Sequence, residues 1–260
     1  MSNFAVLHMT KIKAGAAGGI GRHIDRTIAP ANCNKEHPTP VIRMRIENDS
    51  AVFYAKKRAE TPLHKEIDRI IATHRASKKA IRKDAVTAIG FILSGSNEHM
   101  NAMRKDVKTL KKWMMQNYIF MAQRYGRENI AEFAMHLDET TPHIHCVIVP
   151  LTRDRRLSAK DVIGARNDMQ QLQTDYAQKM SQFGLCRGEE QSSAQHVAPR
   201  VYYNKINQLT EQQEAKIAQL DAILEHKIDL TIELAENLAK SLKTAKNERE
   251  QQKKRRGFRL

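Results

Sequence analysis

Apolar and polar positions alternate or recur with regular periods along most of the chain. Period-two or continuous apolar runs predict strands at 3–9, 41–46 and 84–95, and a pair of strands within 129–152 joined by an Asp-Glu-Thr-Thr-Pro turn. The alternating arginines of 41–46 are equally compatible with an extended loop. Helical spacing predicts helices at 63–74, at 96–125 with Ser96 as the N-cap, and at 167–183 with Gly184 as the stop.

The order of these elements indicates the fold class. Strands come in hairpin-like pairs with long helices between them, and no βαβ repeat is present. This order predicts an α+β domain with an antiparallel sheet and flanking helices. Between the first two strands, residues 11–26 mix four glycines with basic residues, which predicts a flexible loop followed by the start of a helix around His23.

The composition changes after about Arg200, so we divide the chain into a domain at 1–200 and an arm at 201–260. Between Ile206 and Lys246 there is no Gly and no Pro, and Ile and Leu recur in steps of three and four with a slip near Thr231. This pattern predicts one long helix, either a coiled-coil arm of a homodimer or an amphipathic helix folded back on the first domain. The basic end, KKRRGFRL, is expected to be disordered.

The net charge of the chain indicates which kind of partner it binds. The formal net charge is +15 and the pI is about 9.8, which favours nucleic acid. A membrane surface is a weaker option, because no lipidation signal is visible. Three widely spaced cysteines form no CxxC pair, so neither a disulfide framework nor a zinc ribbon is indicated. With no signal-peptide core and no apolar run of membrane-spanning length, we expect a cytoplasmic protein.

The stretch HLDETTPHIH, residues 136–145, holds three of the eleven histidines. Alternate residues of a strand share a face, so His143 and His145 project together, and the preceding antiparallel strand can bring His136 to the same face. Three neutral imidazoles make an open metal site with positions left for substrate and water. Asp138 or Glu139 in the turn can be a further ligand, an acceptor that orients an imidazole, or a proton acceptor. A metal there would polarise a phosphate oxygen, and a basic protein makes a phosphodiester the natural substrate.

Several motifs together resemble one family. HLDETTPHIHCVIVP (136–150) resembles the metal motif of the Mob/Pre (MobV) plasmid mobilisation relaxases, which belong to the HUH endonucleases. KAGAAGGIGRHIDR (13–26) with the following Asn34-Lys35, RASKKAIRKDAV (75–86) and, more loosely, RLSAKDVIG (156–164) resemble the same family. The resemblance covers roughly residues 1–190. Relatives usually continue well beyond a coiled-coil segment, whereas this sequence ends at Leu260; a short member and a truncated chain both fit.

The resemblance implies a fold, an activity and a set of site residues. The fold is an HUH relaxase-like antiparallel sheet with the metal histidines on a central strand. The activity is site- and strand-specific nicking of origin-of-transfer DNA, leaving the nucleophile on the 5′ phosphate and delivering the strand to conjugative coupling machinery. The motif places a divalent metal, with Mn²⁺ favoured, on His136, His143 and His145, with Glu139 nearby. The nucleophile is implied to be His23, which would form a phosphoramidate; Tyr54, flanked by basic residues, is the rival.

Basic residues around the first and second motifs are candidates for DNA contacts. Arg26 could hold the scissile phosphate as a bidentate donor. The candidate phosphate contacts are Lys11, Lys13, Arg22, Arg75, Lys79, Arg82 and Lys83. The glycines match no nucleotide-binding fingerprint, so no nucleotide cofactor is expected. A DNA-binding module or repressor with a structural metal, a metallohydrolase of small substrates, and an HUH replication initiator or transposase remain open alternatives.

Overall fold

The structure, a computed structural model, describes residues 3–30, 32–47, 50–56, 59–188 and 199–257. The chain divides into two compact units, Met1–Glu190 and Gln191–Leu260, and the four motifs named above all lie in the first. The α7 helix, Pro199–Gly257, lies in the second. No helix in the described part of the chain is long and apolar enough to cross a membrane.

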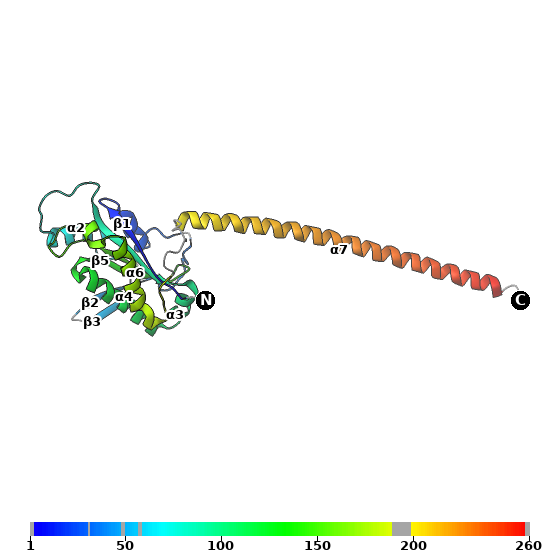
Figure 1. Cartoon of the computed structure of the whole chain (residues 1–260). Helices are drawn as coiled ribbons and strands as arrows, with labels where there is room; N and C mark the ends of the chain where they lie inside the picture. The colour runs from blue at the N-terminus through cyan, green and yellow to red at the C-terminus, as the bar shows by residue number, and fades with distance from the viewer. Residues whose placement is uncertain (1–2, 31, 48–49, 57–58, 189–198, 258–260) are drawn as a thin grey trace. The chain divides into compact units, whose positions relative to one another are not determined.

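A six-stranded sheet forms the centre of the first unit, and every neighbouring pair of strands is antiparallel (Figure 1). This confirms the α+β class. The spatial order is β1-β4-β6-β5-β2-β3. The strands are β1 Ala5–Lys13, β2 Val41–Glu47, β3 Ser50–Ala55, β4 Val86–Gly95, β5 Ile130–His136 and β6 His143–Ile148. The region of 41–46 is therefore a strand, and the predicted hairpin of 129–152 is β5 and β6.

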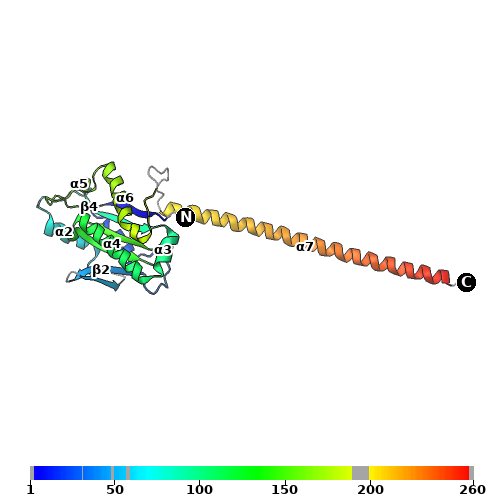
Figure 2. The same ribbon diagram turned by 60° about the horizontal axis from the view of Figure 1, so that its bottom comes forward.

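Helices cover the two faces of the sheet with separate apolar cores (Figures 1 and 2). One core, around Trp113, packs three helices, α3 Asn97–Arg104, α4 Val107–Tyr125 and α6 Arg166–Met180, against the sheet. The other core packs α1 Ala17–Ile24 and α2 Leu63–His74 against the opposite face. A short helix, α5 Ala159–Ile163, precedes α6. The face covered by α1 and α2 is the one that carries the histidines of β5 and β6.

Two boundaries differ from the sequence-based prediction near the N-terminus. The first strand does not end at residue 9 but continues to Lys13, pairing with β4 along its length. The predicted helix does not start around His23: α1 begins at Ala17, and His23 is in its last turn. Gly21 lets α1 pack closely on the start of α2, since a Cβ on Gly21 would lie 3.0 Å from the Cβ of Leu63.

The predicted helix from Ser96 to Tyr125 is two helices. Asp106 interrupts it, because its carboxylate accepts hydrogen bonds from the backbone N–H of Lys108 (3.0 Å) and Thr109 (3.2 Å) and so caps α4. Ser96 occupies the predicted N-cap position of α3, but its side chain makes no capping hydrogen bond; its hydroxyl accepts from Phe4 N at 2.8 Å and ties the start of the chain to the end of β4.

The C-terminal parts of the prediction are mostly confirmed. The helix predicted at 167–183 is α6 followed by a 3-10 turn, and Gly184 ends it with a φ of +75°. The predicted long helix is α7. The basic tail is not disordered throughout, since residues 253–257 continue α7 and 258–260 lie outside the described residues. Lys and Arg are good helix formers, and positive charge suits a helix C-terminus.

Candidate metal and nucleophile site

The β5–β6 hairpin brings three histidines to one face. His136 pairs with His143 across the two strands, and His145 is two residues further along β6. The ring centroid of His136 lies 4.5 Å from that of His145 and 5.2 Å from that of His143. The Nε2 atoms of His143 and His145 are 3.1 Å apart. The three predicted metal ligands therefore converge.

Backbone carbonyls fix the tautomers of two of these rings. The Nε2–H of His136 donates to Ile24 O (3.0 Å), and the Nδ1–H of His143 donates to Thr141 O (2.9 Å). A carbonyl can only accept, so the other nitrogen of each ring keeps its lone pair. His136 Nδ1 is buried and makes no hydrogen bond within the described part of the chain, although Glu139 Oε1 lies 3.6 Å away. An orphaned buried imidazole nitrogen beside two others fits a divalent metal ion.

Two overlapping groups of three residues have the spacing of metal ligands. One consists of His136, Glu139 and His143, and the other of His23, His136 and His145. Each offers ligand atoms within 4.8 Å of one another. The sequence-based set of His136, His143 and His145 is thus contained in a larger cluster, to which the structure adds His23 and in which Glu139, not Asp138, is the acid.

Burial keeps the imidazoles neutral, as a metal ligand or a nucleophile must be. It lowers the pKa of His136 to about 4 and that of His145 well below its usual value. It also lowers the pKa of His23, with Arg26 adding to the effect, while Glu139 acts the other way. Burial of Glu139 opposes its ionisation, but His136, His143 and Arg26 together hold its pKa well below the usual range. Glu139 is therefore an ionised carboxylate and a weak base, whose negative charge lies beside His136 and His143.

Helix α1 places His23 against this cluster. Its ring lies 5.2 Å from that of His145 and 5.6 Å from that of His136, between centroids, and Glu139 Oε1 is 3.9 Å from its Nε2. About a third of the His23 side chain remains exposed, the largest exposed fraction among the clustered residues. A substrate can reach His23 from solvent while the other rings stay covered.

The family comparison agrees with this geometry. The model of the Mob_Pre family, plasmid recombination enzymes, matches residues 1–204. The chain belongs to the Mob/Pre family. A plasmid recombination enzyme of Lactiplantibacillus plantarum is 31% identical over 220 residues, covering 82% of this chain and 58% of the relative. One of Bacillus thuringiensis is 27% identical over 229 residues, covering 87% and 47%. The chain thus spans about half the length of these relatives.

Solved Mob/Pre structures have the same fold. A MobM relaxase domain bound to 22 nucleotides of plasmid pMV158 oriT DNA, in a Mn-bound crystal structure at pH 5.5, superposes with a TM-score of 0.67 at 26% identity. The match covers 78% of this chain and 99% of that domain. A second Mn-bound crystal structure of the same complex, at pH 4.6, gives a TM-score of 0.66 at 27% identity, covering 77% of this chain and 99% of that domain.

Arg26, which we expected to hold the scissile phosphate, is instead occupied by contacts within this Mob/Pre chain. Its Nε and NH2 atoms donate to the two oxygens of Asp138 (2.8 and 2.6 Å), and NH2 also donates to Glu139 Oε1 (2.7 Å). Its NH1 donates to His23 O (3.1 Å), and the side chain is 3% exposed. Arg26 therefore holds the acidic turn against α1. These contacts give the two acids different positions: Asp138 binds Arg26 through both oxygens, whereas Glu139 also faces the histidines.

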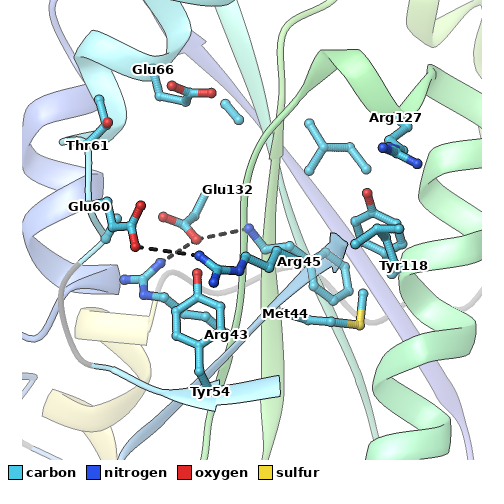
Figure 3. A pocket seen from close by; sticks show the side chains of 15 residues that line it. Arg43, Met44, Arg45, Tyr54, Glu60, Thr61, Glu66, Tyr118, Arg127 and Glu132 are labelled. Carbon is cyan, nitrogen blue, oxygen red and sulfur yellow. Dashed lines mark hydrogen bonds and ion pairs between the residues drawn. The ribbon is translucent and has the colours of Figure 1, made fainter. Parts of the chain in front are cut away.

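Tyr54 lies away from the histidines. One line of paired residues crosses the sheet from Tyr54 through Arg43 and Ala134 to His145. Three strand spacings separate its ends, which is about 14 Å between Cα atoms. Tyr54 instead lines a pocket of about 360 Å³ beside Arg45 and Glu60, where β2 diverges from β5 (Figure 3). Burial raises the pKa of its hydroxyl, which disfavours the phenolate.

The candidate DNA contacts fall into two groups. The exposed residues Lys79, Arg82 and Lys83 lie in the loop after α2, whose Ile81 packs on the core of the histidine face. The half-buried Arg75 precedes them and donates to Lys79 O (2.8 Å). Sequence reasoning missed a hairpin at 151–157, which is closed by an antiparallel bridge between Leu151 and Leu157. The loop after α2 adjoins this hairpin, since Ala76 N donates to Arg155 O at 3.0 Å. That hairpin adds the exposed arginines Arg153, Arg155 and Arg156.

The β1 lysines are not all on that side. Lys11 is paired with Ile89 and through it with Ile148, which pack in the core around Trp113. Paired residues share a face, so Lys11 projects from the face opposite the histidines. Lys13 follows a register shift and is exposed, as is Arg22 on α1.

Proposed function

We propose that this chain is a plasmid mobilisation relaxase, which nicks one strand of origin-of-transfer DNA by metal-dependent transesterification. The observation that carries this proposal is the position of His23, neutral and partly exposed, within 5.6 Å of two buried histidine rings. The Mob/Pre membership supports the substrate, since the related MobM domain is a relaxase bound to oriT DNA. The catalytic domain is residues 1–200, and the arm at 201–260 has a separate role.

The metal ligands in this proposal are His136, His143 and His145, with Glu139 at the edge of the site. A divalent ion held there, Mn²⁺ in our proposal, would polarise a non-bridging oxygen of the scissile phosphate. The crystal structures of the related MobM domain are Mn-bound, which supports that choice. The buried neutral imidazoles suit a divalent ion because they bind it without having to lose a proton first.

His23 is the proposed nucleophile. A ring nitrogen attacks phosphorus, the bond from phosphorus to the 3′ oxygen breaks, and a phosphorus–nitrogen bond forms to the 5′ end of the DNA. The departing 3′ oxygen takes up a proton from solvent and leaves as a hydroxyl. Burial favours the neutral imidazole that this step needs. Glu139, ionised and 3.9 Å from His23 Nε2, favours the positive charge that the ring gains in the attack, and the ring then loses its proton to solvent.

Arg26 acts on this chemistry through its carboxylates and not by holding phosphate. Phosphate contacts are assigned to Lys13, Arg22, Arg75, Lys79, Arg82 and Lys83, with the 153–156 hairpin beside them. Lys11, on the opposite face, is the weakest of the original candidates. We place the reaction in the cytoplasm of a bacterium carrying a mobilisable plasmid, with delivery of the nicked strand to coupling machinery.

The test is a covalent adduct between the protein and single-stranded DNA spanning the plasmid's transfer origin, with Mn²⁺ present. Wild type, His23→Ala and Tyr54→Phe are compared on a denaturing gel. We expect an adduct with wild type and Tyr54→Phe and none with His23→Ala. The adduct should be labile in acid, as phosphoramidates are and tyrosine phosphodiesters are not. Loss with Tyr54→Phe alone would overturn the histidine mechanism, and no adduct with any metal would favour a DNA-binding module.

A further inference from the structure

One buried arginine joins the end of α1 to the sheet. Arg43 on β2 is 1% exposed, and its guanidinium is used on three sides. Its NH2 donates to Asp25 Oδ1, its NH1 donates to Glu132 Oε1, and its Nε donates to Lys56 O at 3.1 Å. Figure 3 shows Arg43 and Glu132 pointing toward one another at the wall of the pocket.

Asp25, the second acid bound by Arg43, lies in the segment that carries His23, the proposed nucleophile. Asp25 directly follows α1, between His23 in the last helical turn and Arg26. Its Oδ1 also accepts from Ala59 N at 3.0 Å, so one carboxylate holds the segment to β2 and to the chain before α2. Arg43 itself is two strands from His145 in the same line of paired residues, about 10 Å between Cα atoms.

Helix α1 needs such an anchor. It has eight residues, three of them glycine, and so short a helix has little stability of its own. Its last turn must nevertheless hold the His23 ring in one place against the histidines of the sheet. Arg26 fastens the chain on one side of His23 to the turn at Asp138, and Asp25 fastens it to the sheet.

We propose that Arg43 is a positioning residue for the nicking reaction: through Asp25 it fixes the end of α1 so that His23 faces the metal-site histidines. This rests on the proposed function, because positioning matters only if His23 attacks the DNA. Arg43 touches neither the histidines nor the scissile phosphate in this scheme. Misplacing a reacting group by about 1 Å can slow a reaction by roughly 100-fold.

The test uses Asp25, because removing Arg43 would leave Glu132 buried without its cation and could unfold the protein. Asp25→Ala removes both hydrogen bonds of the anchor. Asp25→Asn keeps an oxygen that can accept from Arg43 and Ala59. Asp175→Ala is the matched control, since it removes an equal charge from a half-exposed pair with Arg124. The full chain is used throughout, with Mn²⁺ and transfer-origin DNA.

Three quantities are measured for each variant: the single-turnover rate of adduct formation at saturating DNA, the Kd for DNA, and the NMR cross-peak of the His23 ring in metal-free protein. The cross-peak is assigned by its loss in His23→Gln. It reports ring position, because the His136 and His145 rings are close enough to shift it.

Asp25→Ala should slow adduct formation by about 100-fold and move the His23 cross-peak toward its unfolded-chain position, with the Kd of the control. Asp25→Asn should restore both. An unmoved cross-peak, a rate equal to the control, or no rescue by asparagine would overturn the proposal. If wild type forms no His23-dependent adduct, the proposed function itself fails, and the positioning role of Arg43 fails with it.

Discussion

The Nε2 atoms of His143 and His145 face each other at 3.1 Å. His143 uses its Nδ1–H on Thr141 O, so its Nε2 presents a lone pair. Either a neutral His145 donates its Nε2–H to this lone pair, or a cation lies between the two nitrogens. In the proposed metal site, both nitrogens would bind the ion.

Metal should raise the thermal stability of the wild type and not that of His143→Ala. Ligand present at 100 times its Kd stabilises a folded protein by about 2.7 kcal/mol. We expect a rise in Tm with Mn²⁺ that a chelator reverses, and loss of most of that rise in His143→Ala. The variant should also fail to nick while still binding double-stranded origin DNA. An equal metal-induced shift in the variant would exclude His143 as a ligand.

Acid should destabilise the metal-free protein in a defined window. The pKa of His136 is about 4 in the folded protein and 6.5 for a solvent-exposed imidazole, so between these pH values the unfolded chain binds more protons. The contribution of His136 to the free energy of unfolding is fully present above about pH 6.5. It falls progressively toward pH 4, by about 3 kcal/mol in all. Denaturant unfolding across this range checks the slope, which should be smaller in His136→Gln. A flat profile in wild type would contradict the burial of neutral His136.

Breaking the pair of Arg26 and Asp138 should destabilise the fold. Both side chains are 3% exposed, and removing one partner of a buried pair costs about 3–5 kcal/mol. Because Glu139 still accepts from Arg26, we expect Asp138→Asn to fall near the lower value. Asp154→Asn, in an exposed pair with Arg156, is the control and should leave the denaturation midpoint unchanged. Equal midpoints for the two variants would show that the acidic turn is not anchored by Arg26.

DNA affinity should fall steeply with salt, and Lys83 should account for part of that fall. Each phosphate contact contributes about 0.7 to 0.9 to the slope of log K against log salt. Lys83→Ala should reduce the slope by about that amount, whereas Lys112→Ala, on the exposed side of α4, should not. Fluorescence anisotropy at several salt concentrations measures both. A salt-independent affinity in wild type would argue against a DNA partner altogether.

Local pattern predicted the hairpin and its histidines, because strand alternation alone puts His143 and His145 on one face. It could not choose between Asp138 and Glu139, since that choice is made by Arg26, which is 112 residues from Asp138 in the chain. The anchor from Arg43 to Glu132, 89 residues apart, was equally invisible to local periodicity. The break before α4 was visible in principle, because Asp106 followed three residues later by Thr109 is a capping signal. The side of the sheet that Lys11 occupies required the β1–β4 register.

Helix α7 should pair with a second copy of the chain. Its large apolar side chains are exposed within the arm, including Leu220 at 54%, Leu224 at 56% and Ile228 at 56%, and they recur in steps of three and four. Burying one leucine contributes about 1.5–3 kcal/mol, and a dimer buries two copies. Leu224→Lys should therefore weaken association by roughly 100-fold or more. Ala222→Lys adds the same charge two residues away, on another side of the helix, and should not. Sedimentation over a range of concentrations distinguishes them. A wild type that stays monomeric, together with a Leu224→Lys variant whose catalytic unit melts earlier, would mean that the arm packs on its own domain.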